Sequence, residues 1–228
     1  MSTSEKARGR PTADGVRAAL EAASCETERA KIRKRVTDPH TEVIGVRMKT
    51  VFDIAKDRTP MPLDEVDRLL GSDAYEMRMV AVSILDFMAR SRRCTEADRA
   101  AMYGLWMRRL DRINTWDYID RAAPRVIGGY LLDKPRDVLV DLARSDDLWH
   151  RRTAITAAFS IIRAGDLDDP LALCEILAAD PEHFVQTNVG VALREIGRVD
   201  RSRLEEFLGR RGEDLRAHAR RVARTALT

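Results

Sequence analysis

The stretch Thr187-Asn-Val-Gly-Val-Ala-Leu-Arg194 carries a small residue in the middle of an apolar, helix-like pattern. The same arrangement occurs in Arg151-Arg-Thr-Ala-Ile-Thr-Ala-Ala158 and in Arg78-Met-Val-Ala-Val-Ser-Ile-Leu85. Aligning the small residues at positions 81, 154 and 190 gives offsets of 73 and 36 residues, about two periods and one period of a repeat. Small side chains at equivalent places allow neighbouring helices to pack closely, as stacked helix pairs require.

The rest of the chain also has helical periodicity from Thr12 onward, and no stretch shows sustained period-two alternation. Proline and glycine breakers separate the helical segments, and the short loops predict antiparallel helix pairs. Pro124 lies inside one predicted helix and is expected to kink it or to mark its first turns. The helices are predicted at residues 12–24, 26–37, 47–57, 63–70, 74–90, 95–110, 115–131, 136–144, 147–164, 170–179, 182–196, 201–210 and 213–226.

The repeat length lies between those of tetratricopeptide repeats, about 34 residues, and HEAT-type repeats, about 40–47. Because the tetratricopeptide pattern is absent, the predicted fold class is all-α, an irregular HEAT-like helical-repeat solenoid. Such a stack curves, and alternate helices are expected to line a concave, basic groove. Residues 1–11 are predicted to form a disordered basic tail, and residues 12–228 a single HEAT-like domain.

Composition excludes several classes of protein. No run approaches the roughly 18 apolar residues of a membrane helix, and the polar N-terminus lacks the apolar segment of a secretory signal. The cysteines, at positions 25, 94 and 174, are far apart, which favours a reducing cytoplasm over a disulfide framework. The four histidines show no ligand spacing, so no metal site is predicted. No glycine-rich phosphate loop and no nucleophile elbow occurs.

The net charge of +3 is unevenly distributed along the chain. Residues 1–58 and 194–228 each carry a formal charge of +4, whereas residues 59–193 carry −5. Of the 40 basic residues 34 are arginine, the side chain suited to bidentate contact with phosphate. This distribution gives weak support to nucleic-acid binding.

The stretch Asn114-Thr-Trp-Asp-Tyr-Ile-Asp120 begins one of the helices, with Asn114 as the expected N-cap. Trp116 and Asp120 are spaced i and i+4, so both project from the same helical face. An indole plane beside a carboxylate can bind something flat and cationic through cation–π attraction and charge. The alternative is that Trp116 fills the core and that Asp120 is solvated near the helix N-terminus, where the helix dipole favours it.

Alternate helices in one layer would gather several arginines around this pair. Spaced arginines of this kind suit a groove that binds a nucleic-acid backbone. The alternative is a solvated face on which each arginine pairs with a nearby acid. Trp106, Trp149 and Tyr118 lie among apolar neighbours and are expected to pack. The side chains that such a layer collects are Arg78, Trp116, Asp120, Arg152, Arg194, Arg216 and Arg220.

Four patterns between residues 45 and 197 occur in order along the chain. They are Gly45-Val-Arg-Met48 with Ile54-Ala-Lys56, Trp116-Asp-Tyr-Ile-Asp120 with Gly128-Gly-Tyr-Leu131, Trp149-His-Arg-Arg152 with Ala154-Ile155, and Val185-Gln186 with Gly190-Val-Ala-Leu-Arg-Glu195. Together they resemble the AlkD family of DNA alkylpurine glycosylases, which are HEAT-like helical solenoids. The resemblance depends on all four patterns occurring in this order and at these separations.

The resemblance implies roles for individual residues. Trp116 and Asp120 match the family's catalytic tryptophan and aspartate. Arg152 matches an arginine that holds the phosphate near the lesion, and Arg194 lies at a further backbone-contacting position. We also expect Arg47 in the first pattern to contact DNA.

Roles in DNA binding and in the substrate cleft are also expected for Arg220 and Val191. Arg220, on the last helix of the proposed layer, is a further DNA-binding candidate. Val191 stands where the resemblance implies a second tryptophan of the catalytic cleft, so substrate range or rate is expected to differ. The space opened by valine is expected to favour bulky adducts.

A carboxylate and an indole suit hydrolysis of the N-glycosidic bond of a purine alkylated at N3 or N7. Alkylation makes the purine cationic and therefore a good leaving group, and bond cleavage builds positive charge on the deoxyribose. Asp120 would stabilise that charge and orient the attacking water, while Trp116 would pack against the sugar. This chemistry requires no metal and no cofactor.

These observations predict a monofunctional DNA glycosylase that acts on duplex DNA containing alkylated purines. It would serve base excision repair or resistance to an alkylating agent, as a cytoplasmic, nucleoid-associated monomer. The first alternative is a catalytically weak or inactive HEAT-like relative that only binds DNA, which Val191 favours. The second is a protein-interaction scaffold, favoured if acids neutralise the arginines.

Overall fold

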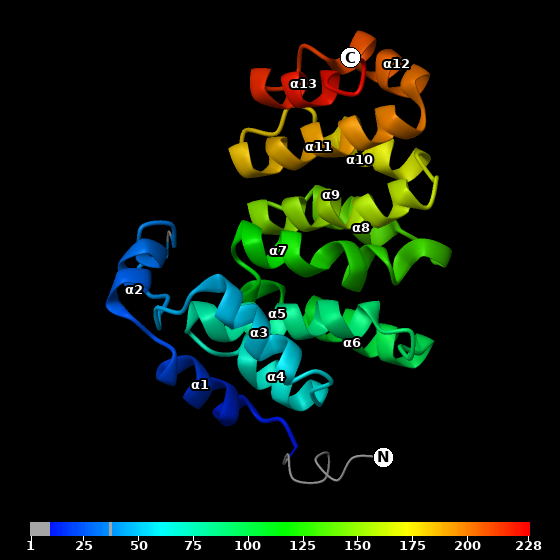
Figure 1. Cartoon of the computed structure of the whole chain (residues 1–228). Coiled ribbons are helices and arrows are strands. Elements are labelled where there is room, and N and C mark those ends of the chain that lie inside the picture. Colours follow the sequence, from blue (N-terminus) through cyan, green and yellow to red (C-terminus); the bar gives the residue numbers. More distant parts are fainter. Residues whose placement is uncertain (1–9, 37) are drawn as a thin grey trace. The chain divides into compact units, whose positions relative to one another are not determined.

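The structure, a computed structural model, describes residues 10–36 and 38–228, which are all-α apart from an isolated β-bridge between Glu42 and Ala74 (Figure 1). Residues 1–9 of the predicted tail lie outside the described residues. The thirteen α-helices of the described residues are α1 (Ala13–Ala22), α2 (Glu26–Arg33), α3 (Met48–Asp57), α4 (Leu63–Leu70), α5 (Tyr75–Arg90), α6 (Glu96–Arg108), α7 (Trp116–Ala123), α8 (Asp137–Ala143), α9 (Leu148–Arg163), α10 (Asp168–Leu177), α11 (His183–Val199), α12 (Arg201–Arg211) and α13 (Ala217–Arg224).

Each predicted helix is present, and the predicted all-α class is confirmed for the described residues. The largest departure is at Pro124, where the helix predicted over residues 115–131 is interrupted. There α7 ends at Ala123, and Pro124–Gly128 forms a π-helical turn closed by a bond from the Gly129 N–H to the Pro124 carbonyl (2.9 Å). Proline has no amide hydrogen to continue the α-helical ladder, which explains why the α-helix ends and a π-helical turn begins at this residue.

The chain divides into two compact units, one ending at Arg112 and the other beginning at Ile113. In the first unit α3 and α4 pack against α5, α6 packs against α4, and α1 contacts all three of α3, α4 and α5. Helix α5 is buried on most of its surface, which explains why its sequence is apolar on several faces. Helical repeats are assembled from locally packed units, so this division does not decide whether residues 12–228 form a single domain. The single domain therefore stays a prediction.

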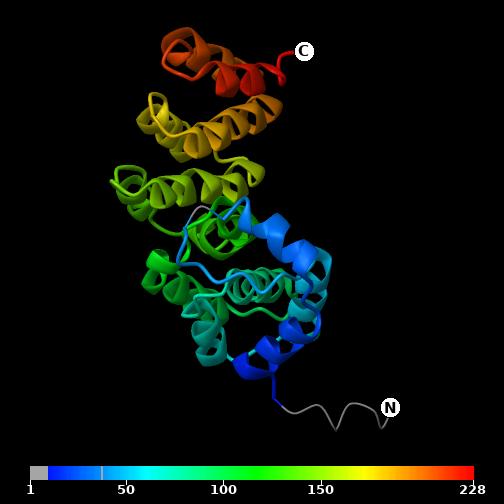
Figure 2. The same cartoon turned by 90° about the vertical axis from the view of Figure 1, so that its left-hand side faces the viewer.

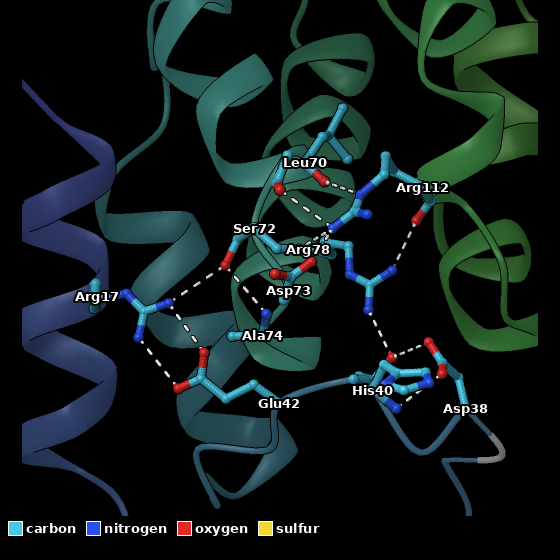
Figure 3. A network of polar contacts seen from close by, with 12 residues as sticks. Arg17, Asp38, His40, Glu42, Leu70, Ser72, Asp73, Ala74, Arg78 and Arg112 are labelled. Atoms are coloured by element: carbon cyan, nitrogen blue, oxygen red, sulfur yellow. Dashed lines mark hydrogen bonds and ion pairs between the residues drawn. The ribbon is translucent and has the colours of Figure 1, made fainter.

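Hydrogen bonds and an ion pair hold the loop between α4 and α5 in place (Figure 3). Arg112 donates to the Ser72 carbonyl (2.9 Å) and to the Asp73 carboxylate (2.7 Å), and this hydrogen bond holds the pKa of Asp73 below its usual value. Arg78, expected among the groove arginines, is buried and donates to the Arg112 carbonyl (3.2 Å) and to the Thr41 hydroxyl (3.1 Å). Arg78 therefore joins segments of the first unit and does not line a surface.

The second unit is a stack of antiparallel helix pairs (Figures 1 and 2). Helix α9 lies between α7 and α11, and α11 lies between α9 and α13, so these four helices form one layer. Helices α8, α10 and α12 form the other layer, with α8 and α10 against α9, and α10 and α12 against α11. The predicted helical repeat, with alternate helices as neighbours, is thus confirmed in this unit. A concave basic groove along the whole chain stays a prediction.

Small residues set the closest approaches in this layer. A Cβ atom on Gly190 would lie 2.7 Å from the Ala219 carbonyl oxygen of α13. A Cβ atom on Gly128 would collide with the carbonyl oxygen of Ala157 in α9. In both cases the obstacle is backbone, which cannot swing aside. The small residue at position 190 therefore has the packing role that the repeat pattern predicted.

Candidate active site

Helix α7 places Trp116 and Asp120 on its exposed face. The helix starts at Trp116 with Thr115 as its N-cap, one residue later than the predicted cap at Asn114. The opposite face, with Tyr118, Ile119, Ala122 and Ala123, is buried. Trp116 is 38% exposed, and the Asp120 side chain is 36% exposed. The alternative in which Trp116 fills the core is therefore wrong.

The other aromatic residues behave as expected. Trp106 and Tyr118 are buried, which confirms that they pack in the interior. Trp149 is half-buried at the start of α9 and packs against Phe184 of α11, with ring centroids 5.4 Å apart. Trp116, with its large exposed surface, is thus the aromatic side chain available to a ligand beside Asp120.

Two residues from neighbouring helices hold the Asp120 carboxylate. Arg152 of α9 donates from Nη2 to both carboxylate oxygens, at 2.9 Å from Oδ1 and 2.7 Å from Oδ2. Asn188 of α11 donates from Nδ2 to Oδ1 at 3.1 Å. The helix stack therefore brings together side chains 32 and 68 positions apart in sequence around one carboxylate. The alternative in which Asp120 is only solvated is also wrong.

The resemblance implies that Arg152 holds a DNA phosphate, whereas in the structure Arg152 binds groups of the protein itself. Its side chain is 3% exposed, and besides Asp120 it donates through Nη1 to the Phe184 carbonyl oxygen. Its contact with Asp120 is made by Nη2 alone, and because both groups are charged these hydrogen bonds are stronger than neutral ones. In this structure the arginine holds Asp120 from its buried side, and a phosphate contact by Arg152 stays a prediction.

Asn188 and Thr156 complete the buried side of the site. Asn188 is 4% exposed, and its Nδ2 also lies 2.7 Å from Oγ1 of the buried Thr156. Sequence reasoning did not assign either residue to the site. The signal that could have found them is an amide inside an apolar helical segment, because a buried amide requires hydrogen-bond partners.

Arg194 and Arg220 are both paired with acids. Arg194 donates to Glu195 at 2.8 Å, and Arg198 shares that carboxylate at 2.9 Å. Burial opposes ionisation of Glu195, but the hydrogen bonds from the two arginines outweigh it and keep the pKa of Glu195 below its usual value. Arg220 pairs with the exposed Glu213 at 2.7 Å. Arg194 and Arg198 share one acid, so this cluster keeps a net positive charge.

The remaining predicted residues lie in different places. Arg47, in the first unit, is the N-cap of α3, 78% exposed and 3.7 Å from Glu28. Val191 is half-buried on α11, three positions after Asn188, and residues spaced i and i+3 share a helical face. Val191 therefore belongs to the side of α11 that carries the Asp120 contact.

The described residues contain no group of three or more His, Cys, Asp or Glu side chains arranged to hold a metal ion. Among the same residues, no helix combines the length and the apolarity needed to cross a membrane. What the site offers is an exposed indole and a carboxylate whose buried side is fully engaged. Such a fixed negative charge next to a flat aromatic surface suits a cationic reacting group.

A family model for DNA alkylation repair enzymes matches residues 16–227. The chain belongs to this family. A solved structure of a predicted DNA alkylation repair enzyme from Enterococcus faecalis has a similar fold, with a TM-score of 0.68 and 15% sequence identity over 90% of this chain and 97% of that chain. A search of curated proteins finds no match.

Membership of the DNA alkylation repair enzyme family assigns the chain to the repair of alkylated DNA, with DNA as its substrate. The family match spans both units and includes every residue of the Asp120 site. Arg194 and Arg220 do pair with acids, which is the condition that favoured the scaffold alternative, but membership of the family favours DNA as the substrate.

Proposed function

We propose that the protein is a monofunctional DNA glycosylase that releases N3- or N7-alkylated purines from duplex DNA. The observation that carries the proposal is the half-exposed Asp120 carboxylate, held from behind by Arg152 and Asn188 and flanked on α7 by exposed Trp116. A preorganised charge of this kind needs no rearrangement at the moment of reaction, which is the main source of electrostatic catalysis.

The proposed reaction breaks the bond between deoxyribose C1′ and the purine nitrogen. The bonding electrons leave with the purine, whose alkylated ring loses its positive charge, while positive charge develops on the sugar. Asp120 stabilises the sugar cation and orients the water that attacks C1′, and the proton that this water loses on forming the C–O bond passes to the surrounding solvent. Trp116 packs against the sugar and adds cation–π attraction, which is worth about 0.5–2 kcal/mol depending on desolvation. These steps use the side chains of α7 and the water, and the protein is proposed to act as a cytoplasmic monomer.

The decisive experiment is incubation of the protein with duplex DNA carrying N7- or N3-methylpurine, followed by measurement of released base. Release of the modified base supports the glycosylase. Salt-sensitive binding to the duplex without release supports the second candidate, a relative that only binds DNA, which the missing aromatic at Val191 favours. If the protein neither binds the duplex nor releases base, both candidate functions are wrong.

Arg194 is expected to contribute to DNA affinity as a phosphate contact. Replacing it by alanine should weaken binding to damaged and undamaged duplexes alike and lower the slope of log affinity against log salt by about one unit. The matched control is Arg201→Ala, since Arg201 is also an arginine in an ion pair, with Glu205 (2.9 Å), but lies on α12 in the other layer. Equal slopes for wild type and Arg194→Ala would remove Arg194 from the interface.

Val191 is expected to widen the substrate range toward bulky adducts. Val191→Trp should add an aromatic wall, so that the ratio of methylpurine release to bulky N3-adduct release rises. The measurement is single-turnover release from the two duplexes, with Val199→Trp on the exposed end of α11 as the control. A ratio that stays constant or falls in Val191→Trp would contradict an open cleft at this position.

A further inference from the structure

The contacts of Asp120 distinguish its two oxygens. Arg152 approaches with a single nitrogen that lies within hydrogen-bond distance of both, so this contact alone does not distinguish the two oxygens. Asn188 contacts Oδ1 alone, at 3.1 Å. A carboxylate oxygen has about two lone-pair sites, so two donors occupy Oδ1 while Oδ2 keeps one site open.

The amide of Asn188 is itself held in one orientation. The Thr156 hydroxyl donates its proton to the Arg152 carbonyl oxygen at 2.7 Å, so Oγ1 can only accept from Asn188, whose Nδ2 lies 2.7 Å away. The other side of that nitrogen faces the Asp120 carboxylate, which also requires a donor. Both neighbours can only accept a hydrogen bond from Asn188, so both must face its amide nitrogen and not its amide oxygen. These bonds therefore fix the orientation of the Asn188 amide group.

We propose that Asn188 is a positioning residue that, anchored by Thr156, turns Oδ2 of Asp120 toward the reacting sugar. The inference rests on the glycosylase function proposed above and deepens it. Asn188 and Thr156 are buried, so neither side chain reaches the substrate, and their effect passes through Asp120. A carboxylate free to rotate would spend part of its time with the open lone pair turned away from the developing charge.

The test is a set of three near-isosteric substitutions. Asn188→Leu removes the donor, and its single-turnover base release should fall about 10- to 100-fold, the range expected for a misplaced reacting group. Thr156→Val should change release in the same direction, by roughly tenfold or less. The control is Thr153→Val, because Thr153 is also buried on α9 and bonds the carbonyl four residues back (Trp149, 2.8 Å) but does not contact Asn188. It should leave release within about twofold of wild type.

A double-mutant cycle separates positioning from a general structural role. Asn188→Leu should reduce release in the wild-type background and have no further effect in an Asp120→Asn background. Affinity for undamaged duplex should be the same for all variants. Equal fold-losses in both backgrounds, or loss of release by Thr153→Val as large as that by Thr156→Val, would overturn the proposal.

Protein stability can be measured without base release, so it distinguishes failure of the Asn188 proposal from failure of the proposed glycosylase function. Urea unfolding of wild type, Asn188→Leu, Asp120→Ala, which removes the acceptor, and the corresponding double variant should show a coupling between the two positions. If wild type releases no base, the glycosylase function fails and the role of Oδ2 in the reaction fails with it. The unfolding cycle then still decides whether Asn188 holds Asp120: additive effects on unfolding would overturn that contact as well.

Discussion

Replacement of Asp120 by asparagine should lower single-turnover base release by about 10²–10³-fold, the usual cost of losing one preorganised electrostatic group. The amide keeps the shape of the side chain and an oxygen that can still accept from Arg152, so the helix stack should remain intact. What is lost is the negative charge opposite the sugar cation. Because that charge develops mainly in the transition state, DNA binding should change little.

The matched control for this substitution is Asp117→Asn. Asp117 lies on the same helix, and its carboxylate accepts the backbone N–H of Tyr118 at 3.1 Å. Its release rate should stay within a few-fold of wild type. If Asp120→Asn shows the same small change as Asp117→Asn, then Asp120 is not the group that stabilises the sugar.

The second large effect is expected in the first unit, at Glu76. This buried carboxylate accepts the backbone N–H groups of Ile44 (3.0 Å), Gly45 (2.8 Å) and Val46 (3.2 Å). Gly45 has a φ of 95°, in the left-handed region that favours glycine. Glu76→Ala would leave three backbone donors without their acceptor, and the free energy of unfolding should fall by about 3–5 kcal/mol.

The measurement is urea unfolding of the first unit followed by the fluorescence of Trp106, in a chain in which Trp116 and Trp149 are replaced by phenylalanine. Glu76→Gln should lose about half as much, because its oxygen can still serve two of the three donors. Asp53→Ala, at an exposed ion pair with Lys49 on α3 of the same unit, should change stability by less than about 0.5 kcal/mol. A loss below about 1 kcal/mol for Glu76→Ala would show that water replaces the carboxylate in this segment.

The arginines show why charge counting along a sequence is a weak guide to a binding surface. Arg78 is buried and bonds within its own unit, Arg152 is turned inward to Asp120, and Arg194 and Arg220 each meet an acid. Arg47, in contrast, is 78% exposed and its nearest acid contact is 3.7 Å. Each of these differences depends on which carbonyl, hydroxyl or carboxylate group the fold places beside the arginine, and spacing along the chain does not encode that arrangement.

Local features of the protein were determined by the sequence itself. Helical periodicity predicted the positions of all thirteen α-helices of the described residues, and Pro124 predicted the interruption after α7. The i and i+4 spacing placed Trp116 and Asp120 on one helical face, because a single helix fixes that geometry. Small residues in a repeat predicted close helix packing, which Gly190 confirms against Ala219.

The surroundings of Asp120 were decided by the tertiary structure. Arg152, Thr156 and Asn188 reach one another because α7, α9 and α11 stack with a particular rotation and register, and that arrangement depends on backbone contacts such as those at Gly128 and Gly190. A periodic pattern reveals which face of a helix is apolar but not which polar side chain of the next helix will meet it. The carboxylate was therefore visible in the sequence, while the hydrogen bonds that orient it required three helices to be in place.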